Sequence, residues 1–449
     1  MNGSSCARIA VLGLVALLGL GPAAAADDAE RQAEAWAARC RDADRVMLDA
    51  AGVAAFNRRL LDVDASLRDL AALPETLAAA EVAALVGGCS RLPEHPLSRS
   101  DGGSPDSAVG PADRDRWIAA LDLGSIPAQV TPRFALVTRR AALRRFPTTE
   151  RVHRPDGPAD IDLFQESAFF PGTPVAAVHA TADDRWSFVL GTTYAAWIDS
   201  AALAFTDRDK ALDFARRSTL VVTAAQATAV PLAAGPGAVG VVLDMGTALP
   251  AGEAGEAGGR SVELPVRSAA GTLALAAARA EPADAFAEGP LPASRRQLLR
   301  QAFRLLGEPY GWGHDNGARD CSGFVCEVYR SLGLLLPRNT RDQAVSPALD
   351  RTLVPRDWPR DRRLAALGRL EPGDLVSMPR HVMMIVGHDA AGPWVIHDTH
   401  AGRLAGASAP VHGVVVAPLA RMLDDAGGPV VDAVTVLIRV LPSSVEPLP

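Results

Sequence analysis

Apolar residues recur at helical spacing in the N-terminal part of the chain. From Asp27 to about Leu92 the sequence is rich in Ala, Glu, Asp and Arg, and its apolar positions are separated by 4, 3, 4 and 3 residues: Phe56, Leu60, Val63, Leu67 and Leu70. Such spacing keeps side chains on one face of a helix, so a few amphipathic helices are predicted here. The stretch 95–111, dense in Pro, Ser, Gly and Asp, predicts a linker. We therefore expect residues 27–111 to form a helical N-terminal segment and linker.

The pattern then changes to short apolar runs separated by turn residues. The first block contains runs at 134–137, 175–178, 186–190 and 194–198, and the second contains runs at 220–222, 239–243, 262–266 and 272–275. Short strands at such spacing are typical of small antiparallel barrels. We therefore expect two all-β barrels, at residues 130–210 and 217–284, with a Gly/Ala/Glu turn at 250–259 inside the second.

The C-terminal part combines helices with a later series of strands. Helical patterns cover 297–306 and 321–334, and strand patterns follow at 374–377, 381–386, 394–397, 413–416 and 434–440. Helices followed by consecutive strands favour an α+β domain with an antiparallel sheet over a doubly wound parallel one. This predicts a third domain at 290–445, and a chain of 449 residues is long enough for several domains.

The charge balance excludes one class of partner. The net charge is −7, from 45 basic and 52 acidic residues, and there is no long basic run. Such a chain has no electrostatic attraction for nucleic acid. We therefore expect no nucleic-acid partner.

The first 26 residues have the layout of a secretory signal. Arg8 precedes an apolar run from Ile9 to Leu20, then Gly21-Pro22 and three alanines before Asp27. The run is shorter than the roughly 20 residues that a membrane span needs. We predict a cleaved signal peptide at 1–26, no transmembrane segment after its removal, and export to the periplasm or cell envelope.

Four cysteines remain after this cleavage. Cys40 and Cys89 lie in the N-terminal segment and can pair in an oxidising compartment. Cys321 and Cys326 fall on different faces of one predicted helix, which does not suit a disulfide. A free thiol in an exported chain indicates a chemical role.

The most informative stretch leads into Cys321. Three glycines, at 311, 313 and 317, precede Asp320-Cys321-Ser322, where a helical pattern begins. The positive end of a helix dipole favours thiolate over thiol, so Cys321 is a candidate nucleophile. Cys326, flanked by valines, fits a structural position.

A cysteine nucleophile needs a base, and the base needs an orienting partner. His381 opens one predicted strand and His397 ends the next, so a hairpin brings them to the same end of the sheet. Asp398 is an alternative third member, but adjacent strand residues face opposite sides, so only one of the two can serve. A metal site built on His381, His388, His397 and His400 is disfavoured because neither Cys-x-x-Cys nor His-Glu-x-x-His occurs.

Five motifs in order resemble those of NlpC/P60 cysteine peptidases. They are Tyr310-x-Trp312-Gly313, Asp320-Cys321-Ser322-Gly323-Phe324, Pro372-Gly373-Asp374, His381 to Gly387, and Val395-Ile396-His397. The resemblance implies a papain-like α+β catalytic domain. It also implies that Cys321 is the nucleophile, His381 the general base and then acid, and His397 the orienting residue.

Carried over in the same way, Tyr310 and Trp312 line the site, and Asp320 and Ser322 help to hold the amine end of a stem peptide. His314 stands where the family usually has a glycine, which puts the loop geometry there in question.

The upstream part resembles a subgroup with an N-terminal helical segment and two bacterial SH3-like barrels. Leu143 to Pro147, Asp162 to Gln165, Pro171 to Val175, Asp184 to Trp186, Tyr194 to Trp197, and the post-helix segment 336–343 carry this resemblance. In relatives the first barrel closes one end of the cleft and admits only a free N-terminal L-Ala. Tyr194 and Glu166 are candidates for that contact, because a phenol and a carboxylate suit an ammonium group; ordinary barrel surface is the alternative for both.

The resulting hypothesis is an endopeptidase that cleaves the γ-D-glutamyl bond to a diamino acid in peptidoglycan stem peptides or murein fragments. A peptidoglycan amidase and a non-catalytic wall-peptide-binding protein are the alternatives. Nothing in the sequence requires a cofactor or a metal.

Overall fold

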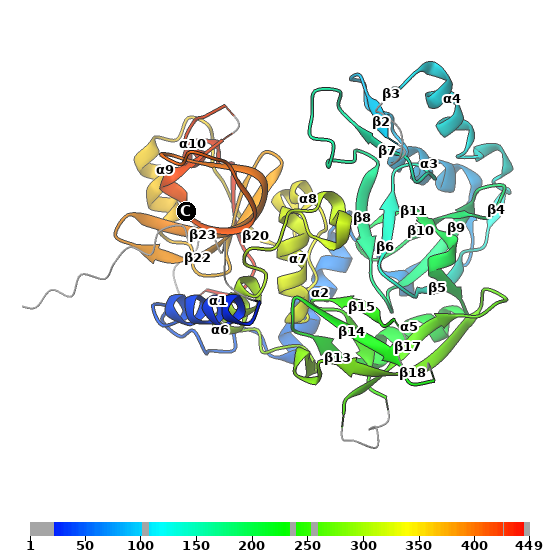
Figure 1. Cartoon of the computed structure of the whole chain (residues 1–449), viewed down its shortest axis with the longest axis horizontal. Helices are drawn as coiled ribbons and strands as arrows, with labels where there is room; N and C mark the ends of the chain where they lie inside the picture. The colour runs from blue at the N-terminus through cyan, green and yellow to red at the C-terminus, as the bar shows by residue number, and fades with distance from the viewer. Residues whose placement is uncertain (1–21, 101–106, 234–238, 253–258, 425, 444–449) are drawn as a thin grey trace, which may run out of the picture.

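The computed structural model describes residues 22–100, 107–233, 239–252, 259–424 and 426–443. Most of the predicted signal peptide and most of the predicted 250–259 turn lie outside these ranges. Figure 1 shows the C-terminal domain on one side and the two β units on the other, with helix α7 (Cys321–Ser331) between them. Within the described ranges, no helix has the length and apolar character that a bilayer span requires.

The N-terminal helices are present, but they pack in two different places. They are α1 (Pro22–Ala37), α2 (Ala50–Val63) and α3 (Ala79–Cys89). Helix α1 packs on α6 (Arg295–Phe303) and contributes to the core of the C-terminal domain. Helix α3 contributes Val82 and Val86 to the core of the first β unit. The N-terminal segment therefore contributes to the cores of the C-terminal domain and of the first β unit.

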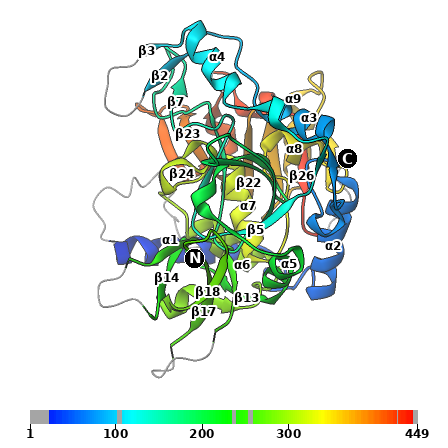
Figure 2. The ribbon, with the colours of Figure 1, turned by 90° about the vertical axis from the view of Figure 1, so that its right-hand side faces the viewer.

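The predicted linker contains short strands. β2 (Ser98–Ser100) pairs with β3 (Ser107–Ala108) and with β7 (Arg151–His153), and α4 (Pro111–Ala119) follows. The expectation that 95–111 only connects two parts of the chain is therefore wrong. A Pro- and Gly-rich composition does not predict strands. Those found here have two or three residues, and β2 pairs with a strand some 50 positions away. Figure 2 shows this small sheet and α4 at the opposite end of the molecule from the second β unit.

The first β unit, called barrel 1 below, is one antiparallel sheet of seven strands in the order β12-β5-β9-β10-β11-β6-β8. Buried aromatic side chains, among them Phe134, Phe188 and Trp197, fill its interior. The strands are β5 (Arg133–Val137), β6 (Ala141–Arg144), β8 (Gln165–Phe169), β9 (Pro174–Ala180), β10 (Trp186–Leu190), β11 (Ala195–Asp199) and β12 (Leu203–Phe205). The predicted runs coincide with β5, β9, β10 and β11.

The second β unit follows α5 (Arg208–Arg217) and is also all-β. It has a three-stranded sheet, β16-β13-β19, and a four-stranded sheet, β15-β14-β18-β17. The strands are β13 (Ser218–Val222), β14 (Gln226–Pro231), β15 (Val241–Asp244), β16 (Ala248–Pro250), β17 (Ser261–Arg267), β18 (Leu273–Glu281) and β19 (Phe286–Glu288). Three strands of this unit, β14, β16 and β19, were not predicted; the apolar residues of β14 are mostly alanine, and β16 and β19 have three residues each.

The C-terminal domain is α+β, and its main sheet is antiparallel, as predicted. The strand order is β20-β26-β21-β22-β23-β24, and α7 packs on β22 and β23. The strands are β20 (Asp350–Leu353), β21 (Leu375–Met378), β22 (His381–Asp389), β23 (Gly392–Leu404), β24 (Val411–Pro418) and β26 (Val436–Arg439). Helix α7 ends three residues earlier than predicted, because Gly333 adopts a left-handed φ of 78°. The short helices α8 (Thr340–Val345) and α9 (Arg360–Leu367) were not predicted.

Candidate active site

Helix α7 begins at Cys321, as the sequence predicts. Asp320 is its N-cap, and the Asp320 carboxylate accepts a hydrogen bond of 2.7 Å from the backbone N–H of Gly323. The loop before it makes a tight turn in which Gly313 and His314 have left-handed φ angles of 57° and 65°. The thiol therefore lies in the first turn of a capped helix.

The thiol of Cys321 is buried against the main sheet. Its residue is 6% exposed, its Sγ lies 3.5 Å from Thr340 Oγ1, and the backbone N–H of Val382 is a further donor to it. Burial raises the pKa of Cys321 to about 11, and the neighbouring charge of Asp320 adds to this rise. The helix N-terminus was expected to favour the thiolate, whereas burial and Asp320 favour the thiol. The resting cysteine is therefore a protonated thiol at neutral pH.

His381 and His397 lie together at one end of the hairpin formed by β22 and β23. Their nitrogens, Nε2 of His381 and Nδ1 of His397, are 2.9 Å apart, and the rings are nearly perpendicular at 78°. His397 is buried, and burial with the neighbouring His381 lowers its pKa well below the usual value. A neutral His397 can accept the N–H of His381 Nε2, which leaves Nδ1 as the basic nitrogen of His381. The residue after His381, Val382, is the one that contacts the thiol.

Asp398 was the alternative partner of His381, but the structure places His397 there. The Asp398 side chain is fully buried, and neither of its oxygens has a hydrogen-bond partner among the described residues. Burial, followed by the charge of Asp320, raises its pKa to about 9. Asp398 is therefore a neutral acid at physiological pH.

Arg338 joins the N-cap of α7 to barrel 1. Its guanidinium donates to both oxygens of Asp320 at 2.8 and 3.1 Å, to Ser322 Oγ at 3.0 Å and to Ser167 Oγ at 2.7 Å. Burial alone would raise the pKa of Asp320, but Arg338 and His314 outweigh it and lower this pKa to about 2. The sequence analysis assigned no role to Arg338 or Thr340, although both lie in the 336–343 segment that carries the family resemblance.

His314 contacts two side chains, Glu327 of α7 and Arg338. Its Nε2 lies 2.9 Å from Glu327 and its Nδ1 accepts a bond of 2.8 Å from Arg338. Burial, and then the charge of Arg338, lower the pKa of His314 to about 4, so it is neutral. Its left-handed φ is one that glycine adopts freely, which matches the family's usual residue at this position. The ring packs against Gly323, where an added Cβ would lie 2.4 Å from it.

Tyr310 and Trp312 occupy the loop beside the thiol. Burial, and then the nearby charge of Cys321, raise the pKa of Tyr310 well above its usual value. Its ring also meets the rings of His400 and His412. Trp312 is 38% exposed, and its indole N–H donates to the Gln165 carbonyl of barrel 1 at 3.1 Å.

Tyr194 and Glu166 of barrel 1 lie against each other. The Tyr194 hydroxyl donates to the Glu166 carboxylate, which also pairs with Arg145 at 2.6 Å. Burial and Glu166 raise the pKa of Tyr194 well above its usual value, and the charge of Arg338 opposes that rise. The residues on either side of Glu166 make the direct contacts to the C-terminal domain: Ser167 to Arg338, and Gln165 to the Gly313 carbonyl at 2.8 Å.

The remaining cysteines and histidines lie in other surroundings. Cys326 donates to the Pro337 carbonyl at 3.4 Å, and burial raises its pKa to about 11. Cys40 and Cys89 are both free thiols in separate hydrophobic clusters, so the pairing left open by the sequence is not formed. Among the residues that the structure describes, no three His, Cys, Asp or Glu side chains are grouped to hold a metal ion.

Two parts of the sequence match known families. Residues 307–408 match the NlpC/P60 family, and residues 151–199 match the SH3 domain of SH3b1 type. The SH3 match lies within barrel 1 and β7, and the expected SH3-like character of the second β unit stays a prediction. No curated protein matches the chain.

Solved structures support the fold. An NlpC/P60 endopeptidase from Photobacterium damselae subsp. piscicida is similar over 85% of this chain and 88% of its own, with a TM-score of 0.70 and 19% identity. An NlpC/P60 family protein from Bacillus cereus is 20% identical, covering 69% of this chain and 100% of its own, with a TM-score of 0.47. At these identities the likeness concerns the fold. The C-terminal domain therefore matches the NlpC/P60 family over residues 307–408, and a match to an SH3b domain precedes it at residues 151–199.

Proposed function

We propose that the protein is a peptidoglycan hydrolase of the cysteine peptidase type, which cleaves the γ-D-glutamyl bond to the diamino acid of stem peptides. The observation that carries this proposal is a helix-borne thiol, Cys321, that receives the backbone N–H of Val382, the residue next to His381, which is hydrogen-bonded to His397. The Photobacterium protein is described as an endopeptidase, and a structural relative from Mycobacterium tuberculosis as a peptidoglycan hydrolase.

The first chemical step is a coupled proton transfer and attack. Because the resting thiol is protonated, His381 takes the S–H proton as sulfur bonds to the scissile carbonyl carbon. His397, held neutral by burial, accepts the N–H of His381 and stabilises the imidazolium.

The oxyanion that forms needs donors. We assign this role to the backbone N–H of Cys321 and the hydroxyl of Tyr310; losing one such donor typically costs about 100- to 1000-fold in rate. The intermediate then collapses, the C–N bond breaks, and His381 protonates the leaving amine. Water, deprotonated by His381, then attacks the thioester carbonyl, the C–S bond breaks, and His381 returns the proton to sulfur.

The amine end of the substrate is proposed to lie toward barrel 1. Asp320, Ser322, Glu166 and Tyr194 are the proposed contacts, and Trp312 forms the rim. Carboxylates and hydroxyls suit an ammonium group, and Arg338 and Arg145 hold the two carboxylates in place. An N-acylated substrate lacks the ammonium, so a free N-terminal L-Ala is the proposed preference.

Export remains part of the proposal. The signal at residues 1–26 predicts that the mature chain begins near Asp27 and acts in the periplasm or cell envelope. N-terminal sequencing of the protein recovered from the periplasmic fraction tests this, and an intact Met1 on the recovered chain would refute cleavage.

The catalytic assignment is tested by paired cysteine variants. Purified wild type, Cys321→Ala and Cys326→Ala are incubated with a soluble stem tripeptide, and the products are identified by mass spectrometry. We expect Cys321→Ala to release no product while Cys326→Ala keeps near wild-type turnover, because Cys321 receives the N–H of Val382, next to His381, whereas Cys326 donates to the Pro337 carbonyl. Hydrolysis by Cys321→Ala at the wild-type rate would refute the proposal, and cleavage between sugar and peptide in muropeptides would indicate an amidase.

A further inference from the structure

Three side chains next to Tyr310 have no role in the mechanism above. They are His400 of β23, His412 of β24, and Asp160 in the segment between β7 and β8. The centre of the Tyr310 ring lies 5.7 Å from that of His400 and 6.4 Å from that of His412, and the two imidazoles are 5.3 Å apart. The Asp160 carboxylate lies 3.0 Å from His400 Nε2. These four residues, called the Tyr310 cluster below, therefore join the C-terminal domain to the segment that precedes β8.

His412 offers a free acceptor atom to this cluster. Its Nδ1 lies 2.6 Å from the backbone carbonyl oxygen of His400. A carbonyl oxygen only accepts, so Nδ1 carries the hydrogen, and Nε2 of the neutral ring is then an acceptor. His412 is exposed, and its Nε2 has no hydrogen-bond partner among the described residues. The ring can therefore receive a hydrogen bond from a bound donor.

The Asp160 carboxylate also has capacity left. Its side chain is 55% exposed, and His400 is its hydrogen-bond partner among the described residues. Arg151, at the start of β7, donates to the backbone carbonyl of Asp160, but its charge pairs with Asp315 at 2.6 Å. With its imidazoles neutral, the cluster thus combines one negative charge, a free nitrogen acceptor and three aromatic rings. This combination suits an ammonium group.

We propose that the Tyr310 cluster binds the side-chain ammonium of the diamino acid that leaves in the reaction. This inference rests on the proposed function. The Asp160 carboxylate and His412 Nε2 accept the ammonium hydrogens, and the Tyr310 ring adds a cation–π contact. None of the four side chains proposed for the amine end of the substrate belongs to the cluster, so it is available for the other end. Lysine and diaminopimelate both carry such an ammonium on a flexible stem.

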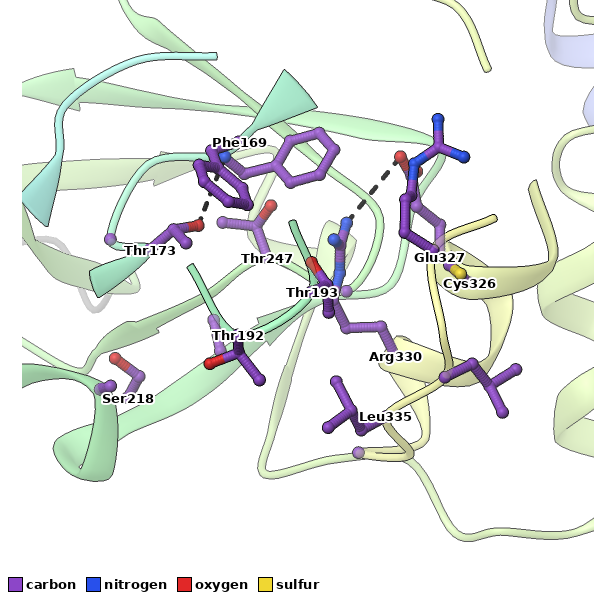
Figure 3. A pocket seen from close by; sticks show the side chains of 18 of the residues that line it. Phe169, Thr173, Thr192, Thr193, Ser218, Thr247, Cys326, Glu327, Arg330 and Leu335 are labelled. Carbon is purple, nitrogen blue, oxygen red and sulfur yellow. Dashed lines mark hydrogen bonds and ion pairs between the residues drawn. The ribbon is translucent and has the colours of Figure 1, made fainter. Parts of the chain in front are cut away.

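The cluster is separate from a cavity of about 550 Å³ on the flank of α7, which is shown in Figure 3. No member of the Tyr310 cluster lines that cavity, and Phe169 and Leu335 are among its apolar walls. The charged residues of its lining are two cations, Arg330 and Arg338, and one carboxylate, Glu327. Because positive charge is in excess there, an ammonium group is better placed at the Tyr310 cluster.

Calorimetric titration tests the site in a protein that binds the peptide without cleaving it, the full mature chain carrying Cys321→Ala. The probe is L-Ala-γ-D-Glu-L-lysine. Its matched control carries 2-aminoheptanoate in place of lysine, so that a methyl group replaces the ammonium. We expect the lysine peptide to bind at least about tenfold more tightly than the methyl analogue. A third peptide carries diaminopimelate, and the tighter of the two amine-bearing peptides identifies the diamino acid.

Variants in the same background assign the preference to the cluster. Asp160→Asn keeps the side-chain shape but removes the charge, and it should reduce the preference to about threefold or less. His412→Phe keeps a ring but removes the acceptor, and it should weaken binding of the lysine peptide about threefold to tenfold, with the methyl analogue unchanged. Asp156→Asn, at an exposed carboxylate of the same segment, should keep the preference unchanged.

Two results would overturn the site: equal affinity for the lysine peptide and its methyl analogue, or a full preference retained in Asp160→Asn. Hydrolysis of both peptides by the wild type is measured in parallel, which separates this inference from the function on which it rests. Cleavage of both peptides with equal affinities would keep the peptidase and remove the ammonium site. A lysine preference that depends on Asp160, without hydrolysis by the wild type, would keep the site and refute the peptidase.

Discussion

Barrel 1 and the second β unit both contact residues around α7, and they do so differently. Barrel 1 contacts two residues outside the helix, through Ser167 on Arg338, which binds the N-cap Asp320, and through Gln165 on the 313 carbonyl. The second unit contacts Arg319, which precedes the N-cap, through Asp244 at 3.6 Å, and Arg330 near the C-terminal end of α7 through the Met245 carbonyl. The comparison agrees with the proposal that barrel 1 contributes to the site, whereas the second unit supports the helix that carries Cys321.

The largest expected effect concerns Cys321, the thiol at the N-terminal end of α7. Because burial raises the pKa of Cys321 to about 11, its thiolate increases as pH rises, by about 1000-fold between pH 7 and pH 10. We expect alkylation by iodoacetamide, followed by peptide mass spectrometry, to accelerate over this range. A rate that is already at its plateau near pH 6 would instead indicate a stable thiolate–imidazolium pair.

Removing Arg338 should damage both the site and the fold. Arg338→Gln leaves the buried Asp320 carboxylate without its cation, which typically costs about 3–5 kcal/mol. We expect a lower midpoint in urea unfolding and a strong fall in kcat/KM. Arg341→Gln, at an exposed position three residues later, should change neither, and an equal loss in both variants would argue against a specific role for Arg338.

Asp244→Asn tests the supporting role of the second β unit. Asp244 is fully buried, and its carboxylate pairs with Arg140 at 2.6 Å. We expect a loss of stability of about 1–3 kcal/mol in urea unfolding, with the discrimination between free and acylated substrates unchanged. Asp207→Asn, at an exposed carboxylate, is the control. If Asp244→Asn changed the discrimination between free and acylated substrates, the second β unit would have a role in substrate selection.

Ser167→Ala is the mildest test of barrel 1. It removes one charge-assisted hydrogen bond to Arg338, worth about 1.5–3 kcal/mol. We expect a small loss of stability but a measurable rise in KM for the free-amine peptide. The exposed Ser408→Ala should match the wild type in both measurements. If KM were unchanged in Ser167→Ala, barrel 1 would have no role in substrate binding through this contact.

Local patterns predicted the elements that carry the site. Short apolar runs and turn residues located the β22–β23 hairpin, which brings His381 and His397 together, and the glycine-rich loop located the start of α7. The antiparallel order of the C-terminal sheet also followed from helices preceding strands.

Long-range contacts account for what the sequence could not predict. The bond from Arg338 to Ser167 spans 171 positions, and no local pattern encodes such a partner. The raised pKa of Cys321 depends on burial by the sheet, which the helix-dipole argument omits. Likewise, the short strands of the 95–111 stretch form only because β7 lies beside them.

The most direct test of the account compares two substrates in one mass-spectrometric assay. Wild type and Cys321→Ala are incubated with L-Ala-γ-D-Glu-diaminopimelate and with its N-acetylated copy. The account predicts that wild type alone releases L-Ala-γ-D-Glu, and only from the free-amine peptide, because the contacts proposed on the barrel 1 side bind the free ammonium group. Equal cleavage of the acetylated copy would remove the role of barrel 1 in selection, and cleavage by Cys321→Ala would contradict the thiol mechanism.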